Sequence, residues 1–449
     1  MRFIVGLSLF AALSLQAADS IDTWFKEGSA HGNIKYYYID TAKDGGNQPT
    51  SSQHANSIGG QLGYVTGSLY GLKLGATFMT TNPFSLPNGD LNVDQSIIGK
   101  DNGKVPGATV ADGNKGFSAL GEVYAQYNRD NYELWYGRKI IETPLIDAKE
   151  VRMLPSSVEG AMGSIKLTPQ TQLQAGFVDK FKQRTNSRFY NIVEHALGAD
   201  THVITGHDRG TVLPASISYK DKAVAVRVYD YYASDFMNSV YADATLSNKL
   251  DSGISYSASV QAIAQESIGN ADSYLASSAK YGGKINAQEI GAKLSTTYDE
   301  STLMAACTHV FSNSGDHDSL VLPWDGTPLF TNMLTANSLF MSNYGDGMKS
   351  DSANIGGTTG LKIGYNQKFD FTGFKGLNAG LSYAHYANGR FPSAEEDVNG
   401  EIVYGIAQFS LALKGIWVTH NTSMGYDPHA TANVNGDLTQ YRVIANYKF

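Results

Sequence analysis

The feature that most limits how this chain can fold is an alternation of apolar and polar residues with a period of two, repeated in segments of about ten residues. It is clearest in residues 441–449. One face of an extended strand there carries Tyr441, Val443, Ala445, Tyr447 and Phe449, and the other carries Arg442, Ile444, Asn446 and Lys448. A tilted strand of this length crosses a bilayer. The pattern therefore predicts an all-β fold, a transmembrane antiparallel β-barrel with lipid outside and water inside.

The same alternation recurs upstream and predicts about 18 strands, with 16 as the alternative. The expected strands are 31–39, 58–67, 70–79, 117–128, 132–139, 157–166, 171–180, 213–220, 223–232, 236–247, 252–265, 286–296, 302–311, 354–367, 376–387, 400–412, 414–423 and 438–449. Every second connection is short, as at 67–68, 128–131, 168–170, 220–222 and 247–249. The intervening connections are usually long, as at 80–116, 181–212 and 312–353. Short periplasmic turns that alternate with long external loops are typical of outer-membrane barrels.

The composition points to the same class of protein. The 449 residues include 47 glycines and 27 tyrosines, and only 17% are charged. The mean hydropathy of −0.24 argues against a bundle of apolar membrane helices. There are 34 basic and 42 acidic residues, and this net charge of −8 argues against a partner nucleic acid. The single cysteine, Cys307, cannot form an internal disulfide.

The N-terminus predicts export. A positive start is followed by an apolar run over residues 3–15 and by the small residues Ala17 and Ala18, the order of a secretory signal peptide. We expect residues 1–18 to be removed by cleavage after Ala17 or Ala18. Residues 19–449 would then form a single barrel in the outer membrane of a Gram-negative bacterium.

A barrel of 18 strands is too wide for side chains to fill, so it would enclose water. Alternation places seven cations on the water-facing side of the wall: Lys35, Lys73, Arg227, Lys293, Lys362, Arg442 and Lys448. Arg227 is the clearest, because Val224, Val226 and Val228 occupy the lipid face. A charge on that face would cost about 2–4 kcal/mol near the midplane. These cations could hand an anion from site to site, or they could simply hydrate and pair with neighbouring carboxylates.

The connection between the expected strands 132–139 and 157–166 carries charges of both signs. They are Glu142, Asp147, Lys149, Glu150 and Arg152. Opposed charges across a constriction create a transverse field that aligns dipolar solutes, whereas on a solvated surface loop their ion pairs would contribute little. Arg152 is the only arginine in this loop, and its guanidinium suits bidentate capture of a carboxylate. Pro144 and Pro155 restrict the backbone at the two ends.

Two stretches resemble one family, the OprD-type porins. Residues 34–40, Ile-Lys-Tyr-Tyr-Tyr-Ile-Asp, are similar to the first strand of that family. Four further segments resemble the third external loop of that family: Gly137-Arg138-Lys139, Thr143-Pro144-Leu145, Val151-Arg152-Met153-Leu154-Pro155 and Glu159-Gly160. The resemblance implies a monomeric 18-stranded barrel whose third loop, about 140–156, folds inward and narrows the pore. It also groups Arg138 with the loop charges at that constriction.

Members of that family admit amino acids and other carboxylates, but the wall cations here are mostly lysines rather than an arginine ladder, so this selectivity stays open. We expect an outer-membrane porin for passive diffusion of small polar solutes, with carboxylates or amino acids as candidates. The alternative is a barrel that displays loops 181–212 and 312–353 for surface binding or adhesion.

The expected partners are outer-membrane lipid and lipopolysaccharide, small solutes, and the barrel assembly machinery, with the chain as a monomer or a loose trimer. The face formed by Tyr441, Tyr447 and Phe449 resembles the C-terminal signal read by that machinery. No His-Glu-x-x-His, Gly-x-Ser-x-Gly or P-loop motif occurs in the sequence. We therefore expect neither a catalytic site nor a metal or cofactor.

Overall fold

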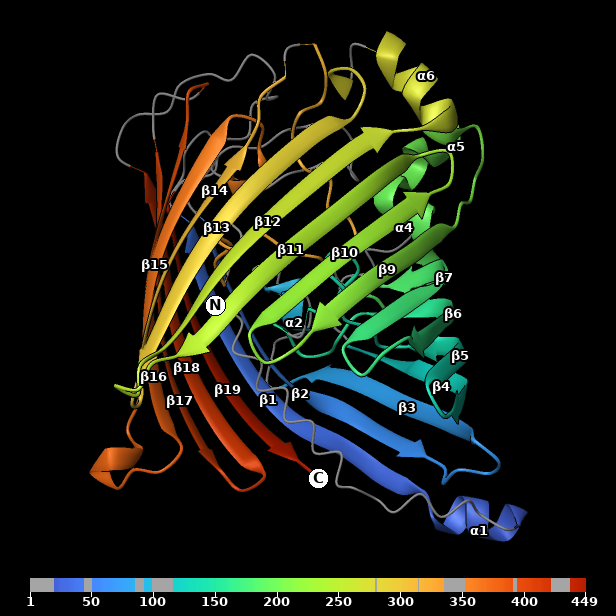
Figure 1. Ribbon diagram of the computed structural model, residues 1–449, viewed down its shortest axis with the longest axis vertical. Coiled ribbons are helices and arrows are strands. Elements are labelled where there is room, and N and C mark those ends of the chain that lie inside the picture. The colour runs from blue at the N-terminus through green and yellow to red at the C-terminus, as the bar shows by residue number, and fades with distance from the viewer. Residues whose placement is uncertain are drawn as a thin grey trace.

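The computed structural model describes residues 20–43, 51–84, 93–98, 116–149, 151–278, 281–313, 315–334, 352–390, 394–420 and 437–449. The predicted signal peptide lies outside these ranges. One antiparallel sheet closes on itself, because β1 (Ser29–Lys43) pairs with β19 (Leu438–Lys448) (Figure 1). Of its 19 strands, β8 (Tyr190–Asn191) has only two residues and pairs with the end of β7, so 18 strands build the wall. The predicted 18-stranded barrel is confirmed.

The remaining wall strands follow one another in chain order. They are β2 (Ser51–Val65), β3 (Leu72–Pro83), β4 (Phe117–Arg129), β5 (Tyr132–Lys139), β6 (Ser157–Lys166), β7 (Thr171–Lys182), β9 (Val212–Lys220), β10 (Val224–Ala233), β11 (Met237–Lys249), β12 (Ser255–Ser267), β13 (Asn286–Tyr298), β14 (Ser301–Val310), β15 (Thr358–Lys368), β16 (Leu377–Asn388), β17 (Glu395–Ile406) and β18 (Phe409–His420).

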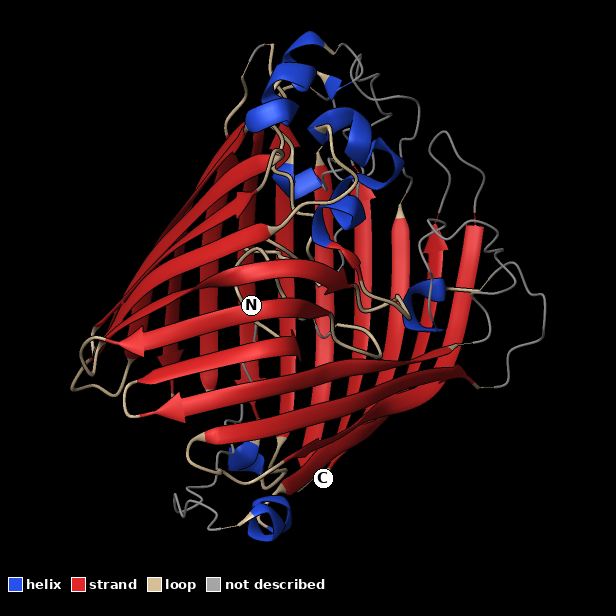
Figure 2. Ribbon diagram, turned by 90° about the vertical axis from the view of Figure 1, so that its right-hand side faces the viewer, coloured by secondary structure: helices blue, strands red, loops and turns tan. Residues whose placement is uncertain are grey.

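Short helices lie in the connections and before β1. They are α1 (Ile21–Lys26), α2 (Gln95–Ile98), α4 (Ile192–Leu197), η1 (Gly198–Asp200), α5 (Thr201–Thr205), α6 (Gly269–Ser277), η4 (Ser352–Asn354) and η5 (Asp370–Thr372). Helices α4, α5 and α6 gather at the end of the barrel that carries the long loops (Figure 2). Within the described ranges, no helix is both long and apolar enough to span a bilayer.

The wall strands are apolar outside and polar inside. In β15, Leu361, Ile363 and Tyr365 point outward and are 52%, 50% and 47% exposed. Lys362 and Asn366, on the other face, are buried inside the barrel. This inversion of a soluble protein's pattern is stable only where lipid surrounds the wall.

Short turns close the other end of the barrel. Asp130 between β4 and β5 and Asp299 between β13 and β14 have φ of 49° and 51°, a left-handed conformation that aspartate tolerates well. The predicted turn at 247–249 is wrong, because β11 continues through Lys249 and the turn lies at 250–254. The predicted strands 400–412 and 414–423 are each about five residues late, because the chain turns at Ala407, with φ of 49°. Alanine is not a turn signal, so this turn was not visible in the sequence.

The described apolar clusters lie on the inner side of the wall, where long loops pack against it. One joins loop residues Leu145, Ile146 and Trp324 to wall residues that include Tyr231 of β10. A second joins Met153 and Leu154 to Tyr37 and Ile39 of β1 and to Ile97 and Ile98 of α2. The loops are therefore anchored in the lumen by burial of apolar surface.

Candidate functional site: the constricted lumen

The third loop, residues 140–156 between β5 and β6, crosses the lumen. At one end the backbone N–H of Leu145 donates to the hydroxyl of Tyr231 on β10, at 3.4 Å. At the other end Tyr37 of β1 donates from its hydroxyl to the carbonyl of Val151, at 3.1 Å. Going round the wall, β1 and β10 are eight strands apart in one direction and ten in the other, so they lie nearly opposite each other. A loop that reaches both must span the barrel.

The loop holds its shape through short-range bonds and two apolar contacts. Thr143 accepts a backbone hydrogen bond from Ile146 at its hydroxyl and donates one back to the Ile146 carbonyl, at 3.2 and 2.7 Å. Leu145 and Ile146 enter the first apolar cluster, and Met153 and Leu154 enter the second. Arg152 therefore lies between two stretches of the loop that are anchored by apolar contacts.

Arg152 lies on the β1 side of the loop. Its Nε donates to Ser96 Oγ at 3.1 Å and its Nη1 to the carbonyl of Val151 at 3.2 Å. Lys35 of β1 donates to the Arg152 carbonyl at 3.2 Å. Burial lowers the pKa of Arg152 to about 10, and repulsion from Arg442 and Arg184 acts in the same direction. The guanidinium is still charged at neutral pH.

Several other charged groups lie around Arg152 in this part of the lumen. Among the described residues, Arg152 makes no ion pair with a carboxylate, although Asp94 is near enough to stabilise its charge. The guanidinium groups of Arg442 and Arg184 and the ammonium group of Lys35 thus lie near that of Arg152, and Arg184 is itself paired with Asp325.

A second loop narrows the lumen, and sequence analysis did not identify it as part of the site. The seventh loop joins β14 to β15, and its described parts are 311–313, 315–334 and 352–357. The backbone N–H of Asp147 donates to the carbonyl of Trp324 at 3.1 Å, and Ile146 forms a β-bridge with Asp325. The third and seventh loops are therefore in direct contact inside the barrel.

A buried ion pair locks this contact. Asp325 pairs with Arg184 of the fourth loop (residues 183–211) and accepts a hydrogen bond from Ser156 Oγ at 2.6 Å. Burial alone would raise the pKa of Asp325, but Arg184, Lys149 and these hydrogen bonds outweigh it and lower the pKa to about 2. One carboxylate thus ties three loops together.

The wall holds the seventh loop by its main chain. Gln265 of β12 bonds both the N–H and the carbonyl of Val321, at 2.7 and 2.9 Å. Four further wall side chains bond backbone atoms of residues 330–334: Gln261, Lys362, Tyr386 and Asn399. The loop therefore lies along the inner face of β12 to β17.

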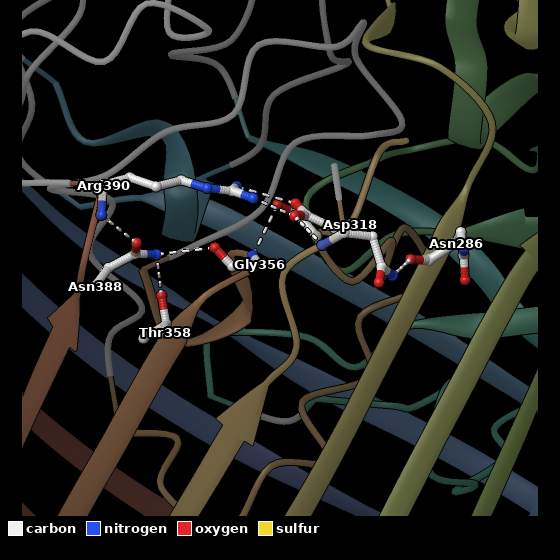
Figure 3. Close-up of polar contacts among 8 residues, drawn as sticks. Asn286, Asp318, Gly356, Thr358, Asn388 and Arg390 are labelled. Atoms are coloured by element: carbon white, nitrogen blue, oxygen red, sulfur yellow. Dashed lines mark hydrogen bonds and ion pairs between the residues drawn. The ribbon is translucent and has the colours of Figure 1, made fainter. Parts of the chain in front are cut away.

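A polar network fixes the base of this loop (Figure 3). Arg390, which follows β16, forms an ion pair with buried Asp318, and its Nη1 lies 3.1 Å from Asp318 Oδ1. Asn388 donates to the carbonyl of Gly356 at 3.0 Å. A Cβ at Gly356 would lie 2.1 Å from Asp318 Oδ1, so only glycine fits at this point. The loop is thus secured by ion pairs at Asp318 and at Asp325.

The seven predicted wall cations all lie on the inward face of their strands, but they do not form a continuous free line. Lys362 is bonded to the carbonyl of Asn332, and Lys293 lies 4.4 Å from the centre of the Phe330 ring. Arg227 makes two bonds to Asp243, at 2.8 and 3.1 Å. Lys35 and Arg442 are buried, whereas Lys73 is partly exposed and Lys448 is exposed.

The structure contradicts the prediction that Arg138 lies at the constriction. It shares a strand face with Tyr132, Leu134 and Tyr136, which are 44%, 52% and 68% exposed, so it points to the outside of the barrel. It pairs across strands with Glu159, not with the loop charges. Arg138 therefore does not line the constriction.

The other predicted loop charges have different surroundings. Asp147 is buried against the seventh loop, Glu142 is exposed, and Lys149 takes a left-handed φ of 42°. Glu150 lies outside the described residues.

No sequence pattern indicated that Ser96, Arg184 and Asp325 belong to the site. A signal for the seventh loop existed in the apolar run Leu320-Val321-Leu322-Pro323-Trp324, which an external loop would not leave in water.

Tyr441, Tyr447 and Phe449 point outward and are exposed.

A closed barrel with an apolar exterior, a polar interior and a loop across its lumen defines the porin class of outer-membrane channels. The family model of the outer membrane porin, OprD family, matches residues 22–449, and the chain belongs to this family. It is thus an outer-membrane channel for passive diffusion of small polar solutes.

Solved structures share the fold. OccK8 (OprE) of Pseudomonas aeruginosa is 17% identical, with a TM-score of 0.72 over 95% of this chain and 99% of that chain. OccAB1 of Acinetobacter baumannii is 13% identical, with a TM-score of 0.72 over 97% of this chain and 99% of that one. OpdK of Pseudomonas aeruginosa, in its structure with vanillate, is 15% identical, with a TM-score of 0.70 over 95% and 99%. The comparison with curated protein sequences gave no match.

Proposed function

We propose that this porin favours small carboxylates and that the third loop forms its selective constriction at Arg152. The observation that carries the proposal is the position of Arg152 in a loop that spans the lumen, beside Lys35 and within reach of the charges of Arg184 and Arg442. A planar guanidinium binds a carboxylate through two parallel hydrogen bonds, which a neutral sugar cannot match.

The opposing charge needed for a transverse field would come from the other end of the loop, whereas Asp94 partly neutralises the cations on the Arg152 side. Glu142 is exposed and Asp94 lies near Arg152. A solute with one negative and one polar end would be aligned as it passes. Lys149, Glu150 and Asp147 belong to the same proposed constriction. Lys73, which is partly exposed, and Lys448, which is exposed, would act at the end with short turns.

The test compares Arg152→Ala with Arg152→Lys, which keeps the charge and loses the planar fork. Reversal potential is recorded in asymmetric salt, and liposome swelling is measured with vanillate, an aromatic carboxylate, and with a neutral sugar. We expect Arg152→Ala to shift the reversal potential toward cations and to weaken carboxylate binding about tenfold. Arg152→Lys should retain most of the anion preference but bind vanillate less well.

Arg188→Ala provides the matched control, because Arg188 is an exposed arginine of the fourth loop. It should leave both readouts unchanged. If Arg152→Ala instead raises the permeation of charged and neutral solutes equally, Arg152 only pins the loop and the proposed selectivity is wrong.

We also propose that Tyr441, Tyr447 and Phe449 form the surface recognised by the barrel assembly machinery, since all three project from one outward face. Each chain encloses its own lumen, which supports a pore that functions as a monomer or in a loose trimer. Lipopolysaccharide is the lipid expected around its outer half.

A further inference from the structure

A row of three charged side chains crosses three neighbouring strands on the outside of the barrel. Arg138 of β5 lies opposite Glu159 of β6, and Glu159 lies opposite Lys180 of β7. Arg138 also lies opposite Val123, which is exposed on the outer face of β4. Each member of the row is one or two residues from the end of its strand that carries the long loops. The row therefore lies on the outer surface of the barrel, near the end that carries the long loops.

The row is held in place by its central carboxylate. Arg138 Nε donates to Glu159 Oε2 at 2.7 Å, and Lys180 pairs with Glu159 Oε1. The Arg138 guanidinium also lies 4.4 Å from the centre of the Phe189 ring, which comes from the fourth loop. Two cations share one anion, so the row has an excess of one positive charge whose position is fixed.

The location of the row decides what that charge can meet. A cation on the lipid face costs about 2–4 kcal/mol at the midplane but only about 0–1 kcal/mol near the interface. Tyr136, two residues before Arg138 on the same face, is 68% exposed, and aromatic residues are typical of the borders of the apolar band. The row therefore lies at headgroup level, and the long loops place it in the outer leaflet.

A second outward cluster at the same end provides a contrast. His385 of β16 bonds Glu396 of β17 at 2.8 Å, and Tyr383 donates to the same carboxylate. This cluster has one carboxylate and no permanently charged cation, so at neutral pH it has no positive excess. The second cluster therefore lacks the positive excess of the first.

We propose that Arg138 and Lys180 bind a phosphate group of an outer-leaflet glycolipid, which competes with the Glu159 carboxylate for the two cations. The contact with Glu159 uses Nε of Arg138, and the described residues provide no partner for its terminal Nη groups. These two groups are available to donate parallel hydrogen bonds to phosphate oxygens, while the Lys180 ammonium supplies a further positive charge. This inference is independent of the carboxylate selectivity proposed for Arg152.

The test uses the full-length barrel, reconstituted in detergent, and native mass spectrometry with bisphosphorylated lipid A as the probe. We expect the wild type to retain this lipid and Arg138→Gln/Lys180→Gln to bind it about 30-fold more weakly. Dephosphorylated lipid A should bind both proteins equally. Heat-modifiable migration in gels shows that each variant is folded.

Glu159→Gln separates a lipid site from a structural ion-pair row. If the row binds phosphate, loss of the neutralising carboxylate should strengthen lipid A binding about fivefold. His385→Gln/Glu396→Gln is the matched control and should bind as the wild type does. Equal binding by wild type and Arg138→Gln/Lys180→Gln, or weaker binding by Glu159→Gln, would overturn the proposal. Displacement of the lipid by an equal concentration of inorganic phosphate would show a general anion site and would also overturn it.

Discussion

Phe449 lies where the barrel closes. Its backbone N–H donates to the carbonyl of Gly32 at 3.1 Å, and its carbonyl accepts from the N–H of Gly32 at 3.0 Å. Its ring is exposed on the outer face, as are those of Tyr441 and Tyr447. The residue thus contributes both to the seam between β19 and β1 and to the lipid-facing surface.

We expect Phe449→Asp to lower the amount of folded barrel in the outer membrane, because a carboxylate would replace an aromatic ring at the lipid face and would weaken recognition during assembly. The measurement is the fraction of heat-modifiable protein in membrane extracts. Lys448→Gln, on the adjacent water-facing position, is the control and should assemble normally. Equal assembly of Phe449→Asp would show that this aromatic face is not the signal.

Arg138 and Arg152 show which properties of a single residue can be predicted from the sequence: the strand face it occupies can, and its distant contacts cannot. The period-two rule, applied strictly to residues 132–139, puts Arg138 on the face of Tyr132, Leu134 and Tyr136, and the structure agrees. The family resemblance misplaced it because a motif preserves order along the chain and does not record which face a side chain occupies. The surroundings of Arg152 depend on Ser96 and Arg442, which are 56 and 290 residues away in sequence, so no local pattern predicts them.

Among the elements, the seventh loop is the one that sequence patterns describe least well. Its length and polar ends suggested an external loop, yet residues 320–334 lie along the wall and touch the third loop. The decisive contacts join Asp325 to Arg184, 141 residues earlier, and Asp318 to Arg390, 72 residues later. Strand positions follow from local alternation, whereas a loop's path depends on such distant partners.

We expect Asp325→Asn to loosen the contact among the third, fourth and seventh loops, because Arg184 would be left buried without its counter-charge. Breaking a buried pair in this way costs about 3–5 kcal/mol. Single-channel recordings should show a larger and noisier conductance, and Asp208→Asn, in an exposed part of the fourth loop, should not. A quiet, unchanged conductance would mean that the pair does not hold the loops.

The pH dependence of this effect has a defined sign. The pKa of Asp325 is lowered from an ordinary value near 3.8 to about 2, so its stabilising charge is fully present above pH 4 and is lost as pH falls through about 2. The difference in conductance between Asp325→Asn and the wild type should therefore be the same at pH 7 and pH 5.

The whole molecule has two chemically different ends. Long loops and helices α4, α5 and α6 gather at one end, and short turns at the other (Figures 1 and 2). We expect Asp208→Cys to react with a membrane-impermeant maleimide on intact cells and Asp221→Cys to react only after permeabilisation. Cys307 is exposed and must first be changed to alanine. Labelling of Asp221→Cys on intact cells would invert the orientation assigned to the barrel.

The seventh loop's attachment by main-chain atoms affects how such a pore can diverge. Wall side chains form hydrogen bonds to the backbone of this loop; they are those of Gln261, Gln265, Lys362, Tyr386 and Asn399. A substitution in the loop that changes only a side chain therefore removes none of these bonds. Point mutations there can alter the chemistry that a passing solute meets while the path of the loop is inherited unchanged. In a lineage under selection for new nutrients, substrate range and barrel architecture can thus evolve almost independently.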